Sequence, residues 1–232
     1  MGENERVISP PSHVIFDLDG TLMDSSPGIL ESFRLTLAER GREFSSERLR
    51  HLIGPPLRHS FGVLGFADDE LDEVVEQYRA HYAGVGLRGA TLYDGVPEAL
   101  DELHQRGVRL AVATAKRVDF AERMLADHGV ARFFDVVRGA SLDLRVTTKE
   151  DIMGEVFEVW ANPARERVWM VGDRAFDMAG ARHHGVIGVG VTWGFGTDSE
   201  LSAAGASLLV SSPAELLEYA TGERTTMRSR GA

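Results

Sequence analysis

Residues 13–21 read HVIFDLDGT and pass from apolar to acidic within one short stretch. The run over residues 13–16 is short and mostly apolar, which predicts a buried strand. Asp17 and Asp19 follow at once, and Gly20 indicates a loop where the strand ends. The stretch therefore predicts a strand whose carboxyl end carries two acidic side chains.

Further along the chain, from about residue 91, apolar runs and helical patterns alternate. The predicted strands cover 108–114, 134–137, 168–171, 187–191 and 208–210, and the predicted helices cover 96–106, 118–128, 149–160, 175–184 and 213–219. This alternation is typical of βαβ units. We therefore expect an α/β fold, a Rossmann-like parallel sheet core with helices on both faces.

The segment between the first strand and this alternation has a different character. Apolar residues recur at helical spacing over 26–40 and again over 68–84, and Pro55 and Pro56 interrupt the helical pattern between them. No strand is predicted there. We expect two domains, an α/β core of residues 1–24 and 91–232 and an inserted α-helical domain of residues 25–90.

The composition excludes several classes of function. The 232 residues carry 25 Lys and Arg against 36 Asp and Glu, a net charge of −11, which disfavours binding to nucleic acid or to anionic membranes. There is no cysteine, which excludes disulfides, thiolate zinc sites and thiol nucleophiles. The N-terminus lacks the pattern of a secretion signal, and nothing indicates an obligate partner, so we expect a cytoplasmic monomer.

Polar residues cluster just behind the predicted strands, where ligands bind in parallel α/β sheets. The candidates are Asp17, Asp19, Thr114, Ala115, Lys149, Asp173 and Asp177. Unpaired carboxylates gathered at one edge would repel one another, and a hard cation such as Mg²⁺ relieves that repulsion. Asp17 and Asp173 are the natural side-chain ligands.

The same residues suit phosphoryl transfer. A carboxylate beside a bound phosphate can attack phosphorus, which makes Asp17 the candidate nucleophile. Asp19 would then act as general acid toward the leaving oxygen and as base toward water. Lys149 and Thr114 would supply the cation and the donor that the phosphate oxygens need.

Four ordered motifs carry a resemblance to the haloacid dehalogenase-like superfamily. They are DLDGT at 17–21, VAT at 112–114, Lys149, and GDRAFD at 172–177. The helical insertion is similar to the small-cap subclass, in particular its phosphoglycolate phosphatase and nucleotidase-like branch.

This resemblance implies a catalytic pair, Asp17 and Asp19, and a phosphate site at Thr114, Ala115 and Lys149. It implies Mg²⁺ on Asp17, on the carbonyl of Asp19 and on Asp173. Asp177 would support the metal ligands or anchor a backbone amide, and the substrate would be a small phosphorylated metabolite.

Two of the 25 basic residues are lysines, Lys116 and Lys149. A cation at the start of a helix opposes the helix dipole, and this chain otherwise uses Arg, so Lys149 is expected to have a specific role. Lys116 lies outside the motifs, and its contact with the site is left open.

The leading expectation is a Mg²⁺-dependent phosphatase that works through an aspartyl-phosphate. A phosphosugar mutase using the same Asp17 is the alternative, because the two differ in water exclusion rather than in motifs. A dehalogenase is disfavoured because Asp19 would have no leaving group to protonate. A receiver domain is disfavoured because of the helical insertion and the order of its acidic residues.

Overall fold

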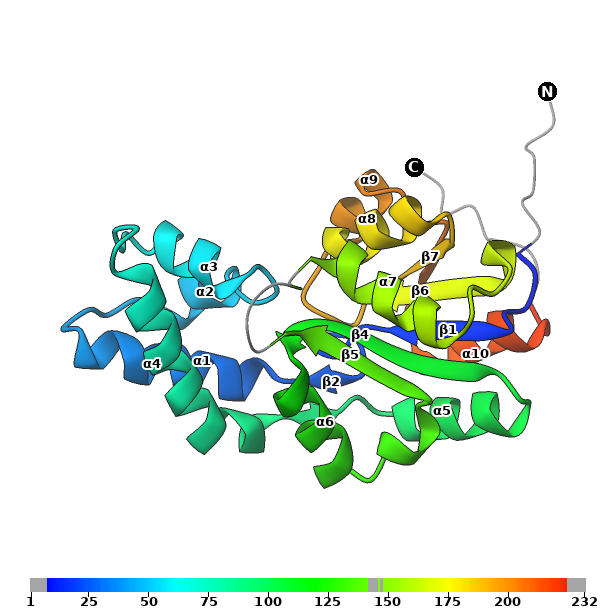
Figure 1. Ribbon diagram of the computed structural model, residues 1–232, viewed down its shortest axis with the longest axis horizontal. Coiled ribbons are helices and arrows are strands. Elements are labelled where there is room, and N and C mark those ends of the chain that lie inside the picture. The colour runs from blue at the N-terminus through cyan, green and yellow to red at the C-terminus, as the bar shows by residue number, and fades with distance from the viewer. Residues whose placement is uncertain (1–7, 142–145, 147, 225–232) are drawn as a thin grey trace.

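The computed structural model describes residues 8–141, 146 and 148–224. Six parallel strands form one sheet in the order β5-β4-β1-β6-β7-β8 (Figure 1). They are β1 (His13–Phe16), β4 (Arg109–Arg117), β5 (Val136–Ala140), β6 (Val168–Gly172), β7 (Ile187–Val191) and β8 (Leu208–Val210). The expected α/β fold with a parallel sheet is confirmed.

Helices cover both faces of the sheet because alternate residues of its strands point to opposite sides. Val14 and Phe16 belong to one buried cluster, and Ile15 between them belongs to the other. Figure 1 shows α7 (Lys149–Val159) and α8 (Ala175–His184) on one face. The other face carries α5 (Val96–Gln105), α6 (Val118–Asp127) and α10 (Pro213–Thr221). The central strand β1 is therefore covered on both sides.

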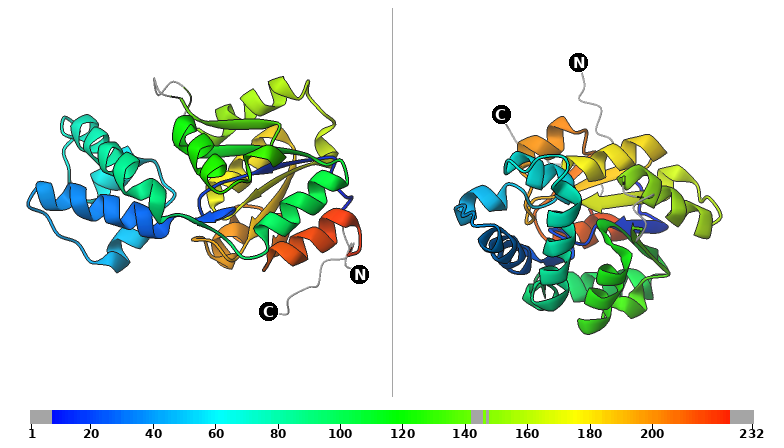
Figure 2. Two further views of the ribbon diagram at one scale, coloured as in Figure 1. Left: turned by 90° about the horizontal axis from the view of Figure 1, so that it is seen from below. Right: turned by 60° about the vertical axis from the view of Figure 1, so that its left-hand side comes forward.

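Four helices follow the first strand and lie to one side of the α/β body (Figure 2). They are α1 (Ser26–Glu39), α2 (Ser46–Arg50), α3 (Leu57–Val63) and α4 (Leu71–Gly84). An aromatic cluster holds them together: the Phe33 ring centroid lies 5.2 Å from that of Phe61 and 4.8 Å from that of Tyr78. We call this helical block the cap.

A short antiparallel ribbon connects the two parts. Strand β2 (Met23–Asp24) pairs with β3 (Thr91–Leu92), so the chain leaves the α/β body and returns to it at one place. This ribbon was not expected from the sequence, because two-residue strands are too short to show a periodic pattern. The proposed domain boundaries at residues 24 and 91 fall on it.

Several boundaries differ from the expected ones. Strand β4 continues to Arg117 although its last residues are polar, and β5 ends at Ala140 rather than at residue 137. Helix α9 (Asp198–Ala203) and the short turns of 3-10 helix at Ala131–Phe133 and Arg165–Arg167 were not expected, whereas the turn at Gly86–Gly89 falls in the segment expected to be helical. Polar strand ends and single helical turns carry little hydrophobic periodicity, which explains these differences.

Two remaining expectations concern the membrane and the N-terminus. Among the described residues, no helix is both long and apolar enough to cross a membrane. Residues 1–7, which contribute to the expectation that there is no secretion signal, lie outside the described residues.

Candidate active site

The carboxyl ends of the central strands bring the predicted residues together. Asp17 follows β1 and Asp173 follows β6, while Lys149 opens α7 on the neighbouring face. The Lys149 Nζ atom lies 2.9 Å from Asp17 Oδ1 and 2.8 Å from Asp177 Oδ1. It also donates a hydrogen bond of 2.7 Å to the carbonyl oxygen of Ala113. Residues far apart in the sequence thus surround one ammonium group.

Lys149 is a buried cation, and its side chain is only 5% exposed. Burial lowers its pKa, but the carboxylates of Asp17 and Asp177 more than offset that effect and raise the pKa above its ordinary value. Lys149 therefore remains an ammonium group in the folded protein. Its position at the start of α7 is explained by these acidic partners rather than by the helix.

Three buried carboxyl groups form a cluster beside this lysine. Asp17, Asp173 and Asp177 each offer one oxygen, and these oxygens lie within 4.8 Å of one another. Burial is the largest cause that raises the pKa of Asp17, to about 6, even though Lys149 acts in the opposite direction. Burial and the neighbouring carboxylates of Asp177 and Asp17 raise the pKa of Asp173 well above its usual range.

A divalent cation fits this cluster. Asp173 Oδ1 is buried and has no hydrogen-bond partner among the described residues, although its other oxygen accepts 2.7 Å from the backbone N–H of Phe195. A buried carboxylate oxygen without a partner is costly unless something binds it. Oxygen ligands from aspartates are what Mg²⁺ prefers.

The loop after β1 approaches Asp173 closely. Gly20 has a φ of +85°, and a Cβ atom at this position would collide with the Asp173 carboxylate. Gly172, at the end of β6, lies equally close to the carboxyl group of Asp177. These two glycines of the motifs are required because there is no room for a side chain.

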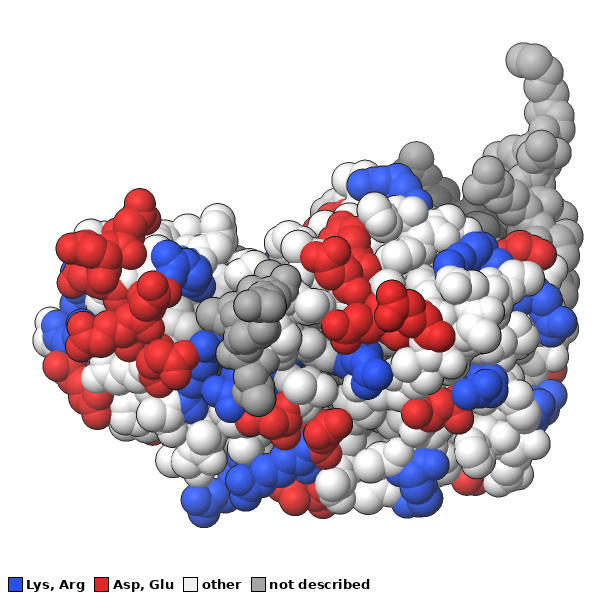
Figure 3. All heavy atoms as spheres, viewed as in Figure 1, with Lys and Arg blue, Asp and Glu red and all other residues white. Residues whose placement is uncertain are grey.

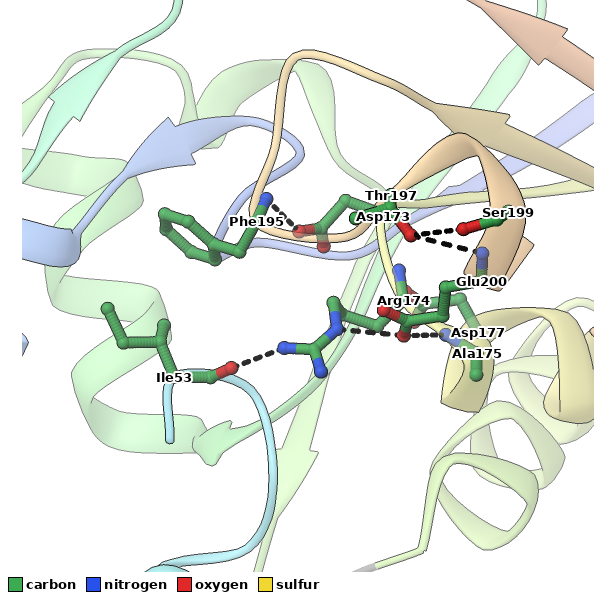
Figure 4. A network of polar contacts seen from close by, with 9 residues as sticks. All are labelled: Ile53, Asp173, Arg174, Ala175, Asp177, Phe195, Thr197, Ser199 and Glu200. Atoms are coloured by element: carbon green, nitrogen blue, oxygen red, sulfur yellow. Dashed lines mark hydrogen bonds and ion pairs between the residues drawn. The ribbon is translucent and has the colours of Figure 1, made fainter. Parts of the chain in front are cut away.

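Asp177 and the turn before α8 are fixed by a polar network, drawn in Figure 4. Asp177 Oδ2 accepts a 3.0 Å hydrogen bond from the backbone N–H of Arg174, so this residue anchors an amide as well as facing Lys149. Glu200 on α9 accepts 2.9 Å hydrogen bonds from Arg174 Nε and from the backbone N–H of Ala175. Arg174 also donates to the carbonyl oxygen of Ile53 in the cap.

Asp19 is separate from the carboxyl cluster and has its own cation. Its Oδ2 atom lies 3.0 Å from Lys116 Nζ, which also donates a 2.6 Å hydrogen bond to the hydroxyl of Tyr82 in the cap. The sequence leaves the contact of Lys116 with the site open and does not point to Tyr82. The rarity of lysine in this chain was the signal for Lys116, and no pattern in the sequence marks Tyr82.

Thr114 and Ala115 lie at the end of β4 and line a cavity together with Asp17, Asp19 and Lys149. The cavity measures about 680 Å³ and lies between the strand ends and the cap. Thr114 is buried, and its hydroxyl accepts a 3.2 Å hydrogen bond from the backbone N–H of Lys116. The predicted phosphate-binding residues therefore share one cleft with both aspartates of the first motif.

The acidic side chains on the outer surface of the cap differ in sign from the two lysines at the cleft. In Figure 3, acidic side chains crowd the face of the cap, where exposed residues include Asp68, Asp69, Asp72, Glu73 and Glu76. The two lysines are buried at the cleft instead. An anionic ligand would therefore find two buried ammonium groups at the cleft.

A parallel α/β body with strand-end aspartates and a helical insertion is the arrangement that the sequence resemblance implied. A model of the haloacid dehalogenase-like hydrolase family matches residues 14–191. The chain belongs to this family.

Two relatives are similar to this chain over most of its length. The chain is 40% identical over 195 residues to the tyrosine-protein kinase PtkA of Mycobacterium tuberculosis, covering 82% of this chain and 66% of that protein. The chain thus spans slightly less than two thirds of the length of PtkA. It is 38% identical over 193 residues to a 5'-nucleotidase of Pseudomonas aeruginosa, covering 82% of this chain and 87% of that protein.

Solved structures give the same result for the fold. The crystal structure of a predicted phosphatase from Clostridium acetobutylicum superimposes with a TM-score of 0.87 at 34% identity. The match covers 92% of this chain and all of that one (100%).

Proposed function

We propose that this protein is a Mg²⁺-dependent phosphatase that hydrolyses a small phosphomonoester through an aspartyl-phosphate on Asp17. One observation carries the proposal: the Asp17 carboxylate contacts the Lys149 ammonium and lies in a cluster with two further buried aspartates, on the wall of a cleft of about 680 Å³. Family membership and the relatives named phosphatase or 5'-nucleotidase support the same activity.

In the first step, an Asp17 oxygen attacks phosphorus and the bond between phosphorus and the ester oxygen breaks. Asp19 gives its proton to the departing oxygen, which leaves as an alcohol. Lys149 stays charged throughout and faces the phosphoryl oxygens from the side of Asp17. Thr114 and the backbone at Ala115 complete the phosphate site.

In the second step, Asp19 takes a proton from a water molecule, and the resulting hydroxide attacks phosphorus. The bond between phosphorus and Asp17 breaks, inorganic phosphate leaves and the carboxylate is restored. Each step needs Asp19 in one protonation state and returns it in the other, so the two steps form a cycle.

Asp17, Asp173 and the carbonyl of Asp19 would hold Mg²⁺. When bound, the cation supplies positive charge to phosphate oxygens and compensates the buried carboxylates. Asp177 lies in the same carboxyl cluster, and its hydrogen bond to Arg174 and ion pair with Lys149 suit a residue that supports the ligands.

The cap of residues 25–90 would cover the substrate, and the core of residues 1–24 and 91–232 would carry the chemistry. The cleft between them is large enough for the ester of a small metabolite. We further propose a cytoplasmic monomer that binds neither nucleic acid nor membranes, which the net charge of −11 supports.

Two other acceptors of the phosphoryl group should be tested in the same assay, a phosphosugar and a tyrosine hydroxyl. None of the relatives described above is named a mutase, so nothing favours transfer back to a phosphosugar. The name of PtkA raises transfer to a tyrosine hydroxyl, which differs from hydrolysis in the acceptor. Incubation with ATP and a tyrosine-containing peptide distinguishes this outcome from release of inorganic phosphate.

The test replaces the nucleophile. We expect the wild-type protein to release phosphate from 4-nitrophenyl phosphate with Mg²⁺ but not with EDTA. Asp17→Asn should lower the rate at least about 10³-fold, because the attacking group is lost. Asp101→Asn, a change on the exposed surface of α5, is the control and should keep wild-type activity. Substantial Mg²⁺-dependent activity in Asp17→Asn would refute the assignment.

A further inference from the structure

Lys116 ends in a buried position between the α/β body and the cap. Its side chain is 7% exposed, and its Nζ atom lies 3.0 Å from Asp19 Oδ2 and 2.6 Å from the Tyr82 hydroxyl. None of the steps proposed above uses this lysine. A buried ammonium that contacts the proposed acid needs an explanation of its own.

A shift in strand register turns this lysine toward the site. Strand β4 pairs with β5 through Thr114 and Gly139, and the next pair joins Arg117 to Ala140. Ala115 and Lys116 are therefore extra residues on β4. Such irregularities commonly redirect a side chain beside an active site.

Tyr82, on helix α4 of the cap, is itself held in place. Its ring stacks on Tyr78 at 5.9 Å between centroids and contacts Phe120 of α6 at 5.6 Å. Its hydroxyl donates to the Met124 sulfur at 3.6 Å, which leaves the oxygen to accept from Lys116. Packing from both the cap and the α/β body thus fixes the Tyr82 hydroxyl oxygen, which accepts the hydrogen bond from Lys116.

The two oxygens of Asp19 have different surroundings. Oδ2 faces Lys116, whereas Oδ1 is buried and has no hydrogen-bond partner among the residues that the structure describes. Asp19 also lines the cleft. Lys116 therefore holds one oxygen of Asp19, while the side chain as a whole stays 17% exposed on the wall of the cleft.

We propose that Lys116 is a positioning residue that fixes the Asp19 carboxyl group, and that Tyr82 fixes Lys116 from the cap. The inference rests on the proposed function, since it assigns Asp19 a proton to give. Tyr82, a residue of the cap, would thus help to orient Asp19 without touching the reacting atoms.

Lysine suits this position better than arginine. Its ammonium is a compact charge whose donors can point to the carboxylate and the hydroxyl at once, whereas the guanidinium of arginine is a wide planar fork. Burial lowers the pKa of Lys116, but Asp19 and Tyr82 raise it above the ordinary value, so the group stays charged.

The experiment compares two esters that differ in their need for a proton. 4-Nitrophenolate leaves phosphorus without protonation, whereas 4-nitrobenzyl alcohol needs a proton from Asp19. Release of each alcohol is followed in a single turnover with enzyme in excess, which isolates the first step from hydrolysis of the aspartyl-phosphate. The variants are Lys116→Met, Lys116→Arg, Tyr82→Phe and the double variant with Lys116→Met and Tyr82→Phe.

We expect Lys116→Met to slow the nitrobenzyl ester at least about tenfold more than the nitrophenyl ester, because a misplaced acid loses part of its usual contribution. Lys116→Arg should restore this ratio only in part. Tyr82→Phe, which keeps the packed ring, should change the ratio in the same direction by a smaller factor and add nothing to Lys116→Met.

Arg109→Met removes a cation at the other end of β4, paired with Asp135, and should leave the ratio at its wild-type value. Equal slowing of both esters in Lys116→Met, or no slowing, would overturn the positioning role while the phosphatase stands. A wild-type protein that cleaves neither ester, or an active Asp17→Asn, would overturn the proposed function and this inference with it.

Discussion

At the scale of single residues, the site depends on how closely polar groups approach one another without water. Lys149 is confined on one side by carboxylates and on the other by Gly180, where a Cβ atom would lie 2.8 Å from the lysine Cγ. The ammonium therefore has few alternative positions. Removing one partner of a buried ion pair leaves an uncompensated charge, which costs far more than the pair contributes.

Gly20 gives a prediction at this scale. Gly20→Ala should be destabilised by its left-handed backbone and also by the collision with the Asp173 carboxylate. Gly41→Ala is the matched control, because Gly41 also has a positive φ, +64°, but no atom within 4 Å of an added Cβ. We expect about 1 kcal/mol from the backbone in both variants and a further loss in Gly20→Ala alone.

Urea unfolding of the two variants measures this difference, and a Mg²⁺ titration of activity accompanies it. Gly20→Ala should need more Mg²⁺ for half-maximal activity, whereas Gly41→Ala should not. Equal losses of stability with unchanged Mg²⁺ dependence would contradict the close approach of Gly20 to Asp173.

At the scale of elements, the turn between β6 and α8 determines where two aspartates lie. Asp177 accepts a hydrogen bond from the backbone N–H of Arg174, and Glu200 of α9 accepts one from that of Ala175. Burial raises the pKa of Glu200, but the hydrogen bonds from Ala175 and Arg174 outweigh it and lower the pKa below its ordinary value. Helix α9, which the sequence did not reveal, thus braces the turn that carries Asp173.

Glu200→Gln tests this bracing. The amide should keep the geometry but weaken the contacts to Arg174 and to the start of α8, at a cost of about 1 kcal/mol because the pair is partly exposed. Since Asp173 lies in the same turn, we expect about tenfold weaker Mg²⁺ activation. Glu102→Gln, which alters an exposed pair with Arg106 on α5, is the control. Unchanged Mg²⁺ activation in Glu200→Gln would mean that α9 does not support the metal ligands.

At the scale of the whole molecule, polar contacts between described residues join the cap to the α/β body beside the site. Arg174 reaches the carbonyl oxygen of Ile53, and Lys116 reaches the Tyr82 hydroxyl. Both side chains come from the carboxyl ends of strands. Cap position and site geometry are therefore linked through Lys116, which contacts Asp19, and through Arg174, which contacts Asp177.

The buried carboxyl cluster predicts how stability depends on pH and Mg²⁺. Burial raises the pKa of Asp17 from 3.8 to about 6, so the folded state without metal binds more protons than the unfolded state. The contribution of Asp17 to stability is then fully present below about pH 4 and is lost as the pH rises through 6. The raised pKa of Asp173 extends this fall to higher pH.

We expect the metal-free protein in EDTA to lose about 3 kcal/mol of unfolding free energy from Asp17 between pH 4 and 7.5. Mg²⁺ should raise the melting temperature more at pH 7.5 than at pH 5, because it binds the charged carboxylates. Urea unfolding and thermal melts measure both effects, and Asp17→Asn should show a shallower pH dependence. Equal slopes in the two proteins would show that Asp17 does not titrate as the structure indicates.

The sequence by itself determined the layer architecture and the acidic motifs. The apolar runs before Asp17 and Asp173 are local features, and so is the helical pattern that α1 and α4 follow. Hydrophobic periodicity is set by neighbours along the chain. Parallel strands all run in one direction, so their carboxyl ends lie at the same edge of the sheet. The clustering of Asp17, Lys149 and Asp173 could therefore be predicted without coordinates.

Tertiary structure alone decided the contacts between distant segments. The pairing of Lys116 with Asp19 and Tyr82 depends on a register shift in β4 and on where α4 packs against α6. The bracing of the β6–α8 turn depends on Glu200, more than twenty residues away along the chain. No periodic pattern encodes such contacts, because they arise only when separate elements pack and leave each buried polar group to find a partner.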